Sequence, residues 1–321
     1  MFPTRAYGLV GCPSAALLVD GRGVPLSRKA IVHPNTLVHE RFKAAQAWCD
    51  KYDRLLDGEF YCPSLVEGED GSLGKLNGLI QSGRGSGTPK PVPDDFGYHI
   101  FDCMTVAQWQ NRDGKEDTDL YMPDFRERDR GMKKYITGAI PHVFVIEQVN
   151  VNSWTEVDEW AKEVWGGGGE GLILRSWDTQ YQHRRCSLKM NDLMKLKDFD
   201  PMECRIIGFE PMTQVAAHAN REVDEFGHRK TVHKKGEKDT IDACGSIRIS
   251  IIEQKILDHF GVDELIMSVG SGLNCQAGSE LNRHWIWENR DRLIGAVVDI
   301  KALLTDADKV PTIPVLKHFR W

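Results

Sequence analysis

Charged residues interrupt two apolar stretches between Glu170 and Lys197, and their chemistry is suited to binding phosphate. Glu170 and Gly171 follow four glycines and lead directly into the apolar segment 172–174. A carboxylate beside a glycine that permits close backbone approach can hold a metal ion. Lys195 and Lys197 alternate with apolar residues, so both ammonium groups project from one face of a strand. Two like charges on one face repel each other, which indicates an anionic ligand, for example a polyphosphate with Mg2+.

A purely structural interpretation of these charges is the alternative. The two lysines could lie on a solvent-exposed strand face, and Glu170 could form an ion-pair network with them. The rest of the chain has to decide between the two interpretations.

The composition is that of an ordinary folded chain. Its 321 residues are enough for two domains, and 41% hydrophobic and 27% charged residues are typical of soluble proteins. No apolar run has the length of a transmembrane helix. The eight cysteines form no CxxC pair, so free thiols in a reducing cytosol are expected. Because the net charge is -6, nucleic acid would have to bind a local basic surface such as 183–197 or 228–235.

The elements that would position these charges can be traced in chain order. Two apolar strands around the turn Asp20–Gly21 form a hairpin that ends at Ser27–Arg28. Asn35 precedes apolar residues at helical spacing, which predicts a capped helix to about Tyr52. Strands are predicted at 55–62, 97–104 and 143–149, and in the first of them Glu59 follows a glycine. Helices are predicted at 124–137 and at 153–165. The second helix is predicted from a Ser153–Glu156 capping box and an apolar stripe.

The segment 72–93 is predicted to be a mobile loop, because glycine and proline accumulate towards its end. Its glycines match neither a Walker A loop nor a dinucleotide-binding motif. These two kinds of phosphate-binding loop are therefore excluded.

After Asp200 the pattern changes to short strands separated by turns. Four to five of them, with one helix around 280–292, occur in the last 120 residues or so. Such a succession is typical of a small barrel such as an OB-fold. We therefore expect a domain boundary near residue 200.

In this order the segments resemble those of small ATP-dependent DNA ligases of the phage type. This family belongs to the covalent nucleotidyltransferase superfamily, together with RNA ligases and mRNA capping enzymes. The resemblance extends from Ala16 to Arg320, and its specificity lies in the order of the blocks. The blocks are Ser27–Arg28, Asp57–Gly58–Glu59, Tyr98–Asp102, Glu170–Gly171, Lys195–Leu196–Lys197, SVGSGL, RHWIWENRDRLIGAVVDIK and PVLKHFR.

The resemblance implies an α+β fold with two domains. Residues 1–199 would form the adenylation (nucleotidyltransferase) domain, made of antiparallel sheets with flanking helices. Residues 200–321 would form an OB-fold β-barrel.

The resemblance also implies an activity, the sealing of nicks in duplex DNA with ATP and Mg2+. A lysine would attack the α-phosphate of ATP to form a lysyl–AMP phosphoramidate with release of pyrophosphate. AMP would then pass to the 5′-phosphate of the nick, and the 3′-hydroxyl would displace it. The implied catalytic residues are Glu59, Glu170, Lys195 and Lys197, of which Glu59 and Glu170 would also bind the metal. The implied nucleotide contacts are Arg28 for phosphate, Phe101 for adenine, with Tyr98 as second choice, and the two lysines. A cytoplasmic monomer that works in DNA replication, repair or recombination is implied as well.

Several alternatives stay open at this point. Phe101 could be an ordinary core residue, since apolar strands commonly bury an aromatic side chain. The enzyme could be an RNA ligase or a capping-type guanylyltransferase. A protein of another class, a non-catalytic nick-binding homologue, would bind nicked duplex in a salt-sensitive manner without consuming ATP.

One departure from the family pattern concerns the nucleophile. The family places it in a KxDG motif before the first hairpin strand, but the corresponding residues here are 10–15 and no lysine precedes Lys29. Lys75, in a KxNG sequence, is a weak substitute, because it follows the Asp57–Gly58–Glu59 block instead of preceding it. Either residues 1–15 are not the native start, or the protein has lost self-adenylylation.

Overall fold

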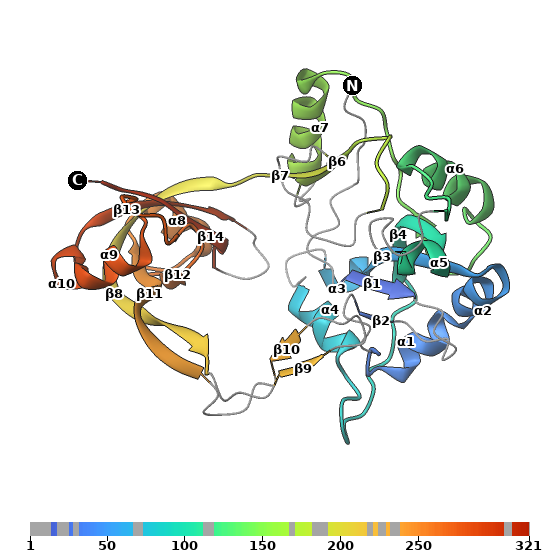
Figure 1. Ribbon diagram of the computed structural model, residues 1–321, viewed down its shortest axis with the longest axis horizontal. Coiled ribbons are helices and arrows are strands. Elements are labelled where there is room, and N and C mark those ends of the chain that lie inside the picture. Colours follow the sequence, from blue (N-terminus) through green and yellow to red (C-terminus); the bar gives the residue numbers. More distant parts are fainter. Residues whose placement is uncertain are drawn as a thin grey trace. The chain divides into compact units, whose positions relative to one another are not determined.

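The computed structural model describes residues 14–17, 26–27, 32–66, 73–111, 119–166, 171–181, 192–216, 221–223, 229–231, 238–304 and 310–320. The chain divides into two compact units, Met1–Asp198 and Phe199–Trp321 (Figure 1). Each unit has its own hydrophobic core. The two units are described separately.

A five-stranded sheet organises the first unit, in the order β2-β1-β3-β4-β5. Its strands are β1 (Ser14–Leu17), β2 (Leu26–Ser27), β3 (Arg54–Tyr61), β4 (Gly97–Thr105) and β5 (Val143–Val145). β5 runs parallel to β4 and all other pairs are antiparallel. Ala16 lies opposite Leu26, which confirms the strands of the predicted hairpin; its turn lies outside the described residues.

The helix predicted after Asn35 is confirmed, with one interruption. Asn35 caps α1 (Thr36–Arg41) by accepting a hydrogen bond from the backbone N–H of Leu37, 2.9 Å away. At Phe42 the backbone leaves the helical conformation, and α2 (Lys43–Tyr52) begins directly after it. Apolar residues of both helices pack on β3 and β4 in one core cluster; they are Val38, Phe42, Ala45 and Cys49.

The prediction of a mobile loop is wrong for the start of segment 72–93, because Leu73–Ile80 forms the helix α4. Leu76, Leu79 and Ile80 are buried in the core of the first unit at helical spacing. Burial of this apolar face outweighs the low helix propensity of its two glycines. The preceding α3 (Pro63–Val66) packs against α4.

The two longer helices occur where the sequence predicts them. Asp124 caps α6 (Phe125–Tyr135), which packs against β4 after the short α5 (Val106–Gln110). In α7 (Trp154–Gly166) the hydroxyl of Ser153 accepts from the N–H of Glu156, as the capping box requires. The second bond of the predicted box differs, because the Glu156 carboxylate accepts from the N–H of Asn152, the residue before Ser153. The apolar stripe of α7 packs on a separate two-stranded sheet of β6 (Gly171–Arg175) and β7 (Leu193–Lys197).

The second unit is built on one antiparallel sheet in the order β12-β11-β8-β13-β14. Its strands are β8 (Asp200–Val215), β11 (Lys238–Ile251), β12 (Ile266–Val269), β13 (Val297–Leu303) and β14 (Thr312–Arg320). Five antiparallel strands are consistent with an OB-fold. The fully closed barrel that the resemblance implied is not formed: within the described residues, a single parallel bridge, Ser271 to Val315, joins the two edges.

In the described part of the second unit, three helices accompany this sheet: α8 (Gln254–Phe260), α9 (Arg283–Glu288) and α10 (Arg290–Leu293). The helix predicted around 280–292 is therefore two helices, separated at Asn289. A small ribbon of β9 (Arg221–Val223) and β10 (Arg229–Thr231) lies between β8 and β11 in sequence. No helix in the described parts of the chain is long and apolar enough to cross a membrane.

Candidate active site

β3 directs its two acidic side chains away from Leu56 and Phe60. Leu56 and Phe60 are fully buried in the core, whereas Asp57 and Glu59 are half-buried. Because side chains alternate along a strand, Glu59 lies on the face of the sheet opposite Leu56 and Phe60, the face that also carries buried Leu55. The predicted acidic residue is thus presented by a strand that the core holds rigidly.

Gly58 allows β4 to approach β3 beside this carboxylate. A Cβ atom at Gly58 would lie 2.4 Å from the backbone oxygen of His99 and 2.8 Å from the Cα atom of Ile100. Real side chains do not tolerate such contacts, so any substitution would push the two strands apart. The glycine of the Asp57–Gly58–Glu59 block therefore serves strand pairing.

The pairing of β3 with β4 is irregular at the predicted adenine-stacking residue. Asp57 pairs with Asp102 and Gly58 pairs with Ile100, which leaves Phe101 without a Cα partner on β3. Phe101 is half-buried. A bulge of this kind redirects a side chain and is common beside functional sites.

Tyr98, the second choice for stacking on adenine, is a core residue. It is fully buried, its hydroxyl donates to the backbone oxygen of Leu56 at 3.0 Å, and its ring contacts Phe42 and Phe60. A ligand cannot reach this ring without opening the core. Phe101 is thus the better candidate.

The Glu170–Gly171 and Lys195–Leu196–Lys197 blocks are brought together by β6 and β7. Gly171 pairs directly with Lys197, and it has a φ of +150°. A Cβ atom there would lie 2.0 Å from the backbone oxygen of Leu196, so only glycine fits. As predicted, Met194 and Leu196 pack inward against the cluster of α7 and β6, while Lys195 is exposed and Lys197 is half-buried.

Lys197 is also electrostatically coupled to Glu59. Burial lowers the pKa of Lys197, and the negative charge of Glu59 partly opposes this by favouring the charged ammonium group. Two blocks that are far apart in the sequence therefore meet in one region. Glu59 and Lys197, both predicted from the sequence, are thus linked by the effect of one charge on the other.

Two predicted residues, Glu170 and Arg28, lie outside the described residues, and so do positions 10–13 of the segment expected to hold the nucleophile. The residue after Glu170, Gly171, pairs with Lys197. The described groups of Asp, Glu, His and Cys side chains include no cluster of three or more that could hold a metal ion. Mg2+ usually binds one or two carboxylates together with substrate phosphates, and the half-buried carboxylate of Glu59 has the chemistry that such an ion requires.

A buried polar network beside Phe101 was not predicted. Asp102 is fully buried, and both of its oxygens accept hydrogen bonds from the guanidinium groups of Arg128 and Arg175. Tyr181 donates to Asp57 at 2.6 Å. Burial first, and then the Asp57 charge, raise the pKa of Tyr181 well above its usual value, so this hydroxyl stays a donor. An acid inside the apolar run YHIFDCM was the available signal for buried partners.

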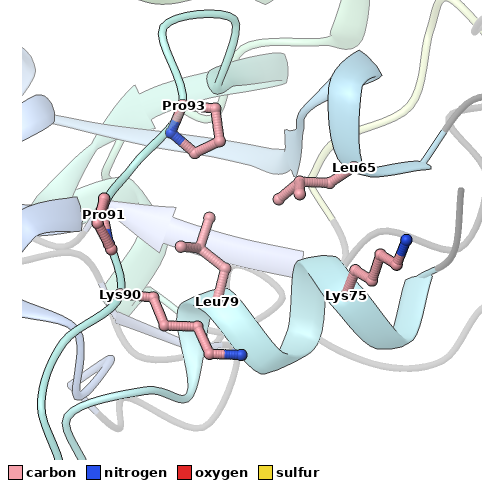
Figure 2. Close-up of a pocket in the computed structure, with 6 residues that line it drawn as sticks. All are labelled: Leu65, Lys75, Leu79, Lys90, Pro91 and Pro93. Atoms are coloured by element: carbon pink, nitrogen blue, oxygen red, sulfur yellow. The ribbon is translucent and has the colours of Figure 1, made fainter.

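Lys75, the weak substitute for the nucleophile, is an exposed residue of α4. It lines a pocket of about 300 Å³ together with Leu65, Leu79, Lys90, Pro91 and Pro93 (Figure 2). Figure 2 shows Lys75 and Leu79 on α4, facing Leu65 and the segment that carries the other three residues. The residues that line this pocket do not include Glu59, Phe101 or the β7 lysines.

Comparison with known proteins identifies related chains. Among curated proteins, none matches this chain. Among solved structures, "Pmar-Lig_Pre." and "Pmar-Lig_PreS3" each align with a TM-score of 0.63, at 18% and 17% sequence identity. The alignments cover 99% of this chain, and the chain spans 63% of the length of each of those two. A structure from a study of Lig E DNA ligases aligns with a TM-score of 0.56 at 15% identity, over 99% of this chain and 92% of its own.

At these identities the likeness shows a shared fold. The sequence model of the ATP dependent DNA ligase domain matches residues 26–197, which is more than half of the chain. The matched range includes Glu59, Phe101, Lys195 and Lys197, and within it the structure pairs β6 with β7 and places Lys197 within the electrostatic influence of Glu59. The chain therefore belongs to the ATP-dependent DNA ligase domain family.

Proposed function

We propose that this chain is an ATP-dependent DNA ligase that seals nicks in duplex DNA through enzyme–AMP and DNA–adenylate intermediates. Residues 1–199 act as the adenylation domain and residues 200–321 as the OB-fold domain. The protein works as a monomer in the cytoplasm, in DNA replication, repair or recombination. Family membership over residues 26–197 supports the reaction class.

The observation that carries the proposal is the meeting of Glu59 with Lys197. A carboxylate from β3 influences an ammonium group on β7, next to the strand that follows Glu170. Chance placement of exposed charges does not explain a half-buried lysine whose pKa is lowered by burial. A site that gathers ammonium and carboxylate groups at a sheet surface suits a magnesium-bound nucleoside triphosphate.

Each residue then has a role in handling charge at the α-phosphate. Lys195 and Lys197 stabilise the negative charge that builds up on its oxygens as the phosphoanhydride bond breaks. Glu59 and Glu170 would hold Mg2+, which would supply further charge neutralisation at the phosphates. Phe101 stacks on adenine, and Arg28 contacts phosphate.

The nick partner requires local basic surface, because the net charge of the chain is -6. Lys195 lies exposed on β7, at the end of the basic stretch 183–197. We expect binding to nicked duplex to weaken with added salt in proportion to the phosphates contacted. Comparing nicked DNA with nicked RNA separates a DNA ligase from an RNA ligase or a capping-type enzyme.

A second function is favoured by one specific observation: residues 10–15, which correspond to the family's KxDG motif, contain no lysine. A homologue without the nucleophile would bind nicks, or seal only ends that already carry AMP. The 3′-hydroxyl would still displace AMP from such an end, since that step uses the phosphate-binding residues and not the nucleophile.

Mass spectrometry of the intact chain after incubation with ATP and Mg2+ tests the first step. An AMP adduct, mapped to a lysine by peptide analysis, is the expected result for a complete ligase. A chain without an adduct is then given pre-adenylylated nicked DNA, and sealing there assigns it to the second function. Failure of both reactions would contradict both sealing activities, and a titration with nicked duplex DNA at increasing salt would then test the remaining alternative, nick binding without ATP consumption.

A matched pair of lysine variants links either activity to the site. Lys197→Met should lower the rate of sealing of pre-adenylylated nicks by at least ~100-fold, the usual loss when one group that stabilises transition-state charge is removed. Lys162→Met changes an exposed lysine on α7 and should leave the rate unchanged. Equal rates for the two variants would exclude Lys197 from the site.

A further inference from the structure

The proposed nucleotide site is divided between two sheets. Glu59 and Phe101 come from β3 and β4 of the five-stranded sheet, whereas Lys195 and Lys197 come from the two-stranded sheet of β6 and β7. A nucleoside triphosphate reaches from a base-binding ring to phosphate-binding lysines. Its affinity therefore depends on how the two sheets are held relative to each other.

Buried Asp102 of β4 lies where it can fix the two sheets relative to each other. Its carboxylate accepts from Arg128 Nε at 2.7 Å and Arg128 Nη2 at 3.1 Å, a bidentate pair, and from Arg175 Nη2 at 2.6 Å. The backbone N–H of Cys103 donates to the same carboxylate at 2.9 Å. Burial favours the neutral acid, but the charges of Arg175 and Arg128 outweigh it and lower the pKa of Asp102, so the carboxylate is ionised.

Arg175 connects the two-stranded sheet with the five-stranded sheet. It is the last residue of β6, and its guanidinium group reaches β4 to donate to Asp102 and, at 3.4 Å, to the backbone oxygen of Phe101. The same guanidinium lies over the ring of Phe125 on α6, 4.0 Å from its centroid. One side chain thus connects the strand that starts at Gly171 with the bulge that presents Phe101.

Arg128 fixes the other side of the carboxylate. Its guanidinium group also donates to the backbone oxygens of Pro123, at 2.7 Å, and Thr179, at 3.3 Å. Thr179 lies just beyond β6, so this arginine also connects the chain after β6 with α6. Both arginines are almost buried, with side-chain exposures of 2% for Arg128 and 12% for Arg175. Buried charge pairs with several donors have a narrow range of geometries, which suits them to hold elements in register.

We propose that Arg175 and Asp102 are positioning residues that align the base-binding bulge at Phe101 with the phosphate-binding lysines of β7. This inference rests on the proposed function, because it assumes that ATP spans both sheets. Neither residue touches the reacting atoms. They hold the two sheets in the orientation that ATP binding requires, so that no binding free energy is lost in reorienting the sheets.

The test compares a ligand that spans both sheets with one that does not. ATP contacts base and phosphate subsites, whereas inorganic tripolyphosphate contacts the lysines alone. In Arg175→Met the dissociation constant of ATP should rise about 10-fold, because misplacement of remote positioning groups costs factors of that order or more. The dissociation constant of tripolyphosphate should stay within about 2-fold, since the β7 lysines remain in place.

Two further variants separate positioning from general destabilisation. Arg175→Lys keeps the charge but cannot supply two donors in the fork geometry of arginine, so it should restore ATP affinity only in part. Arg126→Met is the matched control: Arg126 lies on α6 with an exposed ion pair to Asp178 and a ring contact to Trp177. It should leave both dissociation constants unchanged. All titrations are made at a temperature at which circular dichroism shows each variant folded.

Each outcome decides the inference. Weakened ATP binding with unchanged tripolyphosphate binding in Arg175→Met supports it, and equal changes, or none, overturn it. A wild-type chain that fails to bind ATP overturns the ATP part of the proposed function instead. In that case amide hydrogen exchange decides the inference: loss of protection at Gly171–Arg175 in Arg175→Met, but not in Arg126→Met, supports the link between the sheets, and unchanged protection contradicts it.

Discussion

At two positions of the predicted site blocks, the space beside the backbone determines the residue type. Gly171 is required because the backbone of Leu196 leaves no room for a Cβ atom there. Gly58 is required because the backbone of β4 leaves no room for one. Glu59 and Lys197, their neighbours in β3 and β7, are proposed to act through their charges instead. The same two blocks therefore carry a structural residue beside a chemical one.

Replacing Gly171 by alanine should disrupt the pairing of β6 with β7. The new Cβ atom would meet the backbone oxygen of Leu196 at 2.0 Å, in a backbone region that alanine rarely adopts. We expect the free energy of unfolding to fall by at least about 2 kcal/mol, as for other strained backbone positions. Urea denaturation followed by circular dichroism measures the change.

Gly131→Ala is the matched control for this variant. Gly131 lies inside α6, and no atom lies within 4 Å of the position that its Cβ would take. Alanine should therefore raise the free energy of unfolding by about 1 kcal/mol. A Gly171→Ala protein as stable as Gly131→Ala would contradict the packing of β6 on β7.

His99 predicts a pH dependence of stability. It lies between the rings of Tyr61 and Phe144, and burial lowers its pKa from 6.5 to about 4. The unfolded chain therefore binds a proton at a higher pH than the folded chain. Between pH 6.5 and about 4 the free energy of unfolding should fall as the pH falls.

The variant His99→Phe isolates this contribution, because it keeps a ring between Tyr61 and Phe144. Between about pH 7 and about pH 5, the wild-type protein should lose about 2 kcal/mol more of its free energy of unfolding than the variant. Urea denaturation at the two pH values measures both losses. Equal losses would mean that His99 is protonated in the folded protein at the lower pH.

At the scale of elements, one buried side chain holds several segments of the first unit together. Asn35 caps α1, and its amide group donates to the backbone oxygens of Leu79 and Lys90 and to the hydroxyl of Ser82, each at 3.0 Å. These contacts fix the end of α4 against the segment that completes the pocket of Figure 2. The helix cap and the pocket wall therefore depend on the same residue.

The variant Asn35→Asp should keep the cap of α1 and remove the hydrogen bonds that Asn35 donates to the end of α4 and to the pocket wall. The carboxylate still accepts from the N–H of Leu37, but it cannot donate to the three oxygens. We expect a loss of roughly 2–4 kcal/mol in the free energy of unfolding, because buried acceptors lose their partners and a charge is buried. Asn77→Asp, at an exposed position of α4, should have little effect. A mild effect of Asn35→Asp would show that water replaces the lost donors.

The whole molecule consists of two units with separate cores. In the first unit, the main core lies between the five-stranded sheet and the helices packed on it. In the second unit, the core is formed by side chains of the five antiparallel strands and of the helices beside them. Within the second unit, Arg283 of α9 donates to the backbone oxygens of Cys244, Gly245 and Gly270 at 2.6–2.8 Å. It therefore anchors a helix to the irregular part of β11.

Arg283→Met should destabilise the second unit and leave the first unchanged. Three carbonyl groups lose their donor, so amides of β8 and β11 should exchange faster by a factor that corresponds to about 2–4 kcal/mol. Hydrogen-exchange mass spectrometry reads both units in one experiment. Arg248→Met, at an exposed position of β11, is the control. Equal acceleration in β3 and β4 would mean that the two units unfold together.

The order of local signals along the chain determined most of its architecture. Asn35 as a helix cap, the stripe of α7, the alternation in β7 and the strand succession after Asp200 all appear in the structure as predicted. These features depend on interactions within a few residues, such as capping or one-face burial, so periodicity is enough to find them. The same blocks also predicted the family, which the match over residues 26–197 confirms.

Contacts between distant segments were decided by the tertiary structure. The helix α4 formed despite its glycines because Leu76, Leu79 and Ile80 reach a core built by other elements. Tyr98 was assigned to the core, and Phe101 to a bulge, by the register of β4 on β3. The pairing of Asp102 with Arg128 and Arg175 brings together three segments whose spacing in the chain carries no signal. A buried charge in a strand indicates that partners exist, but the fold alone determines which residues they are.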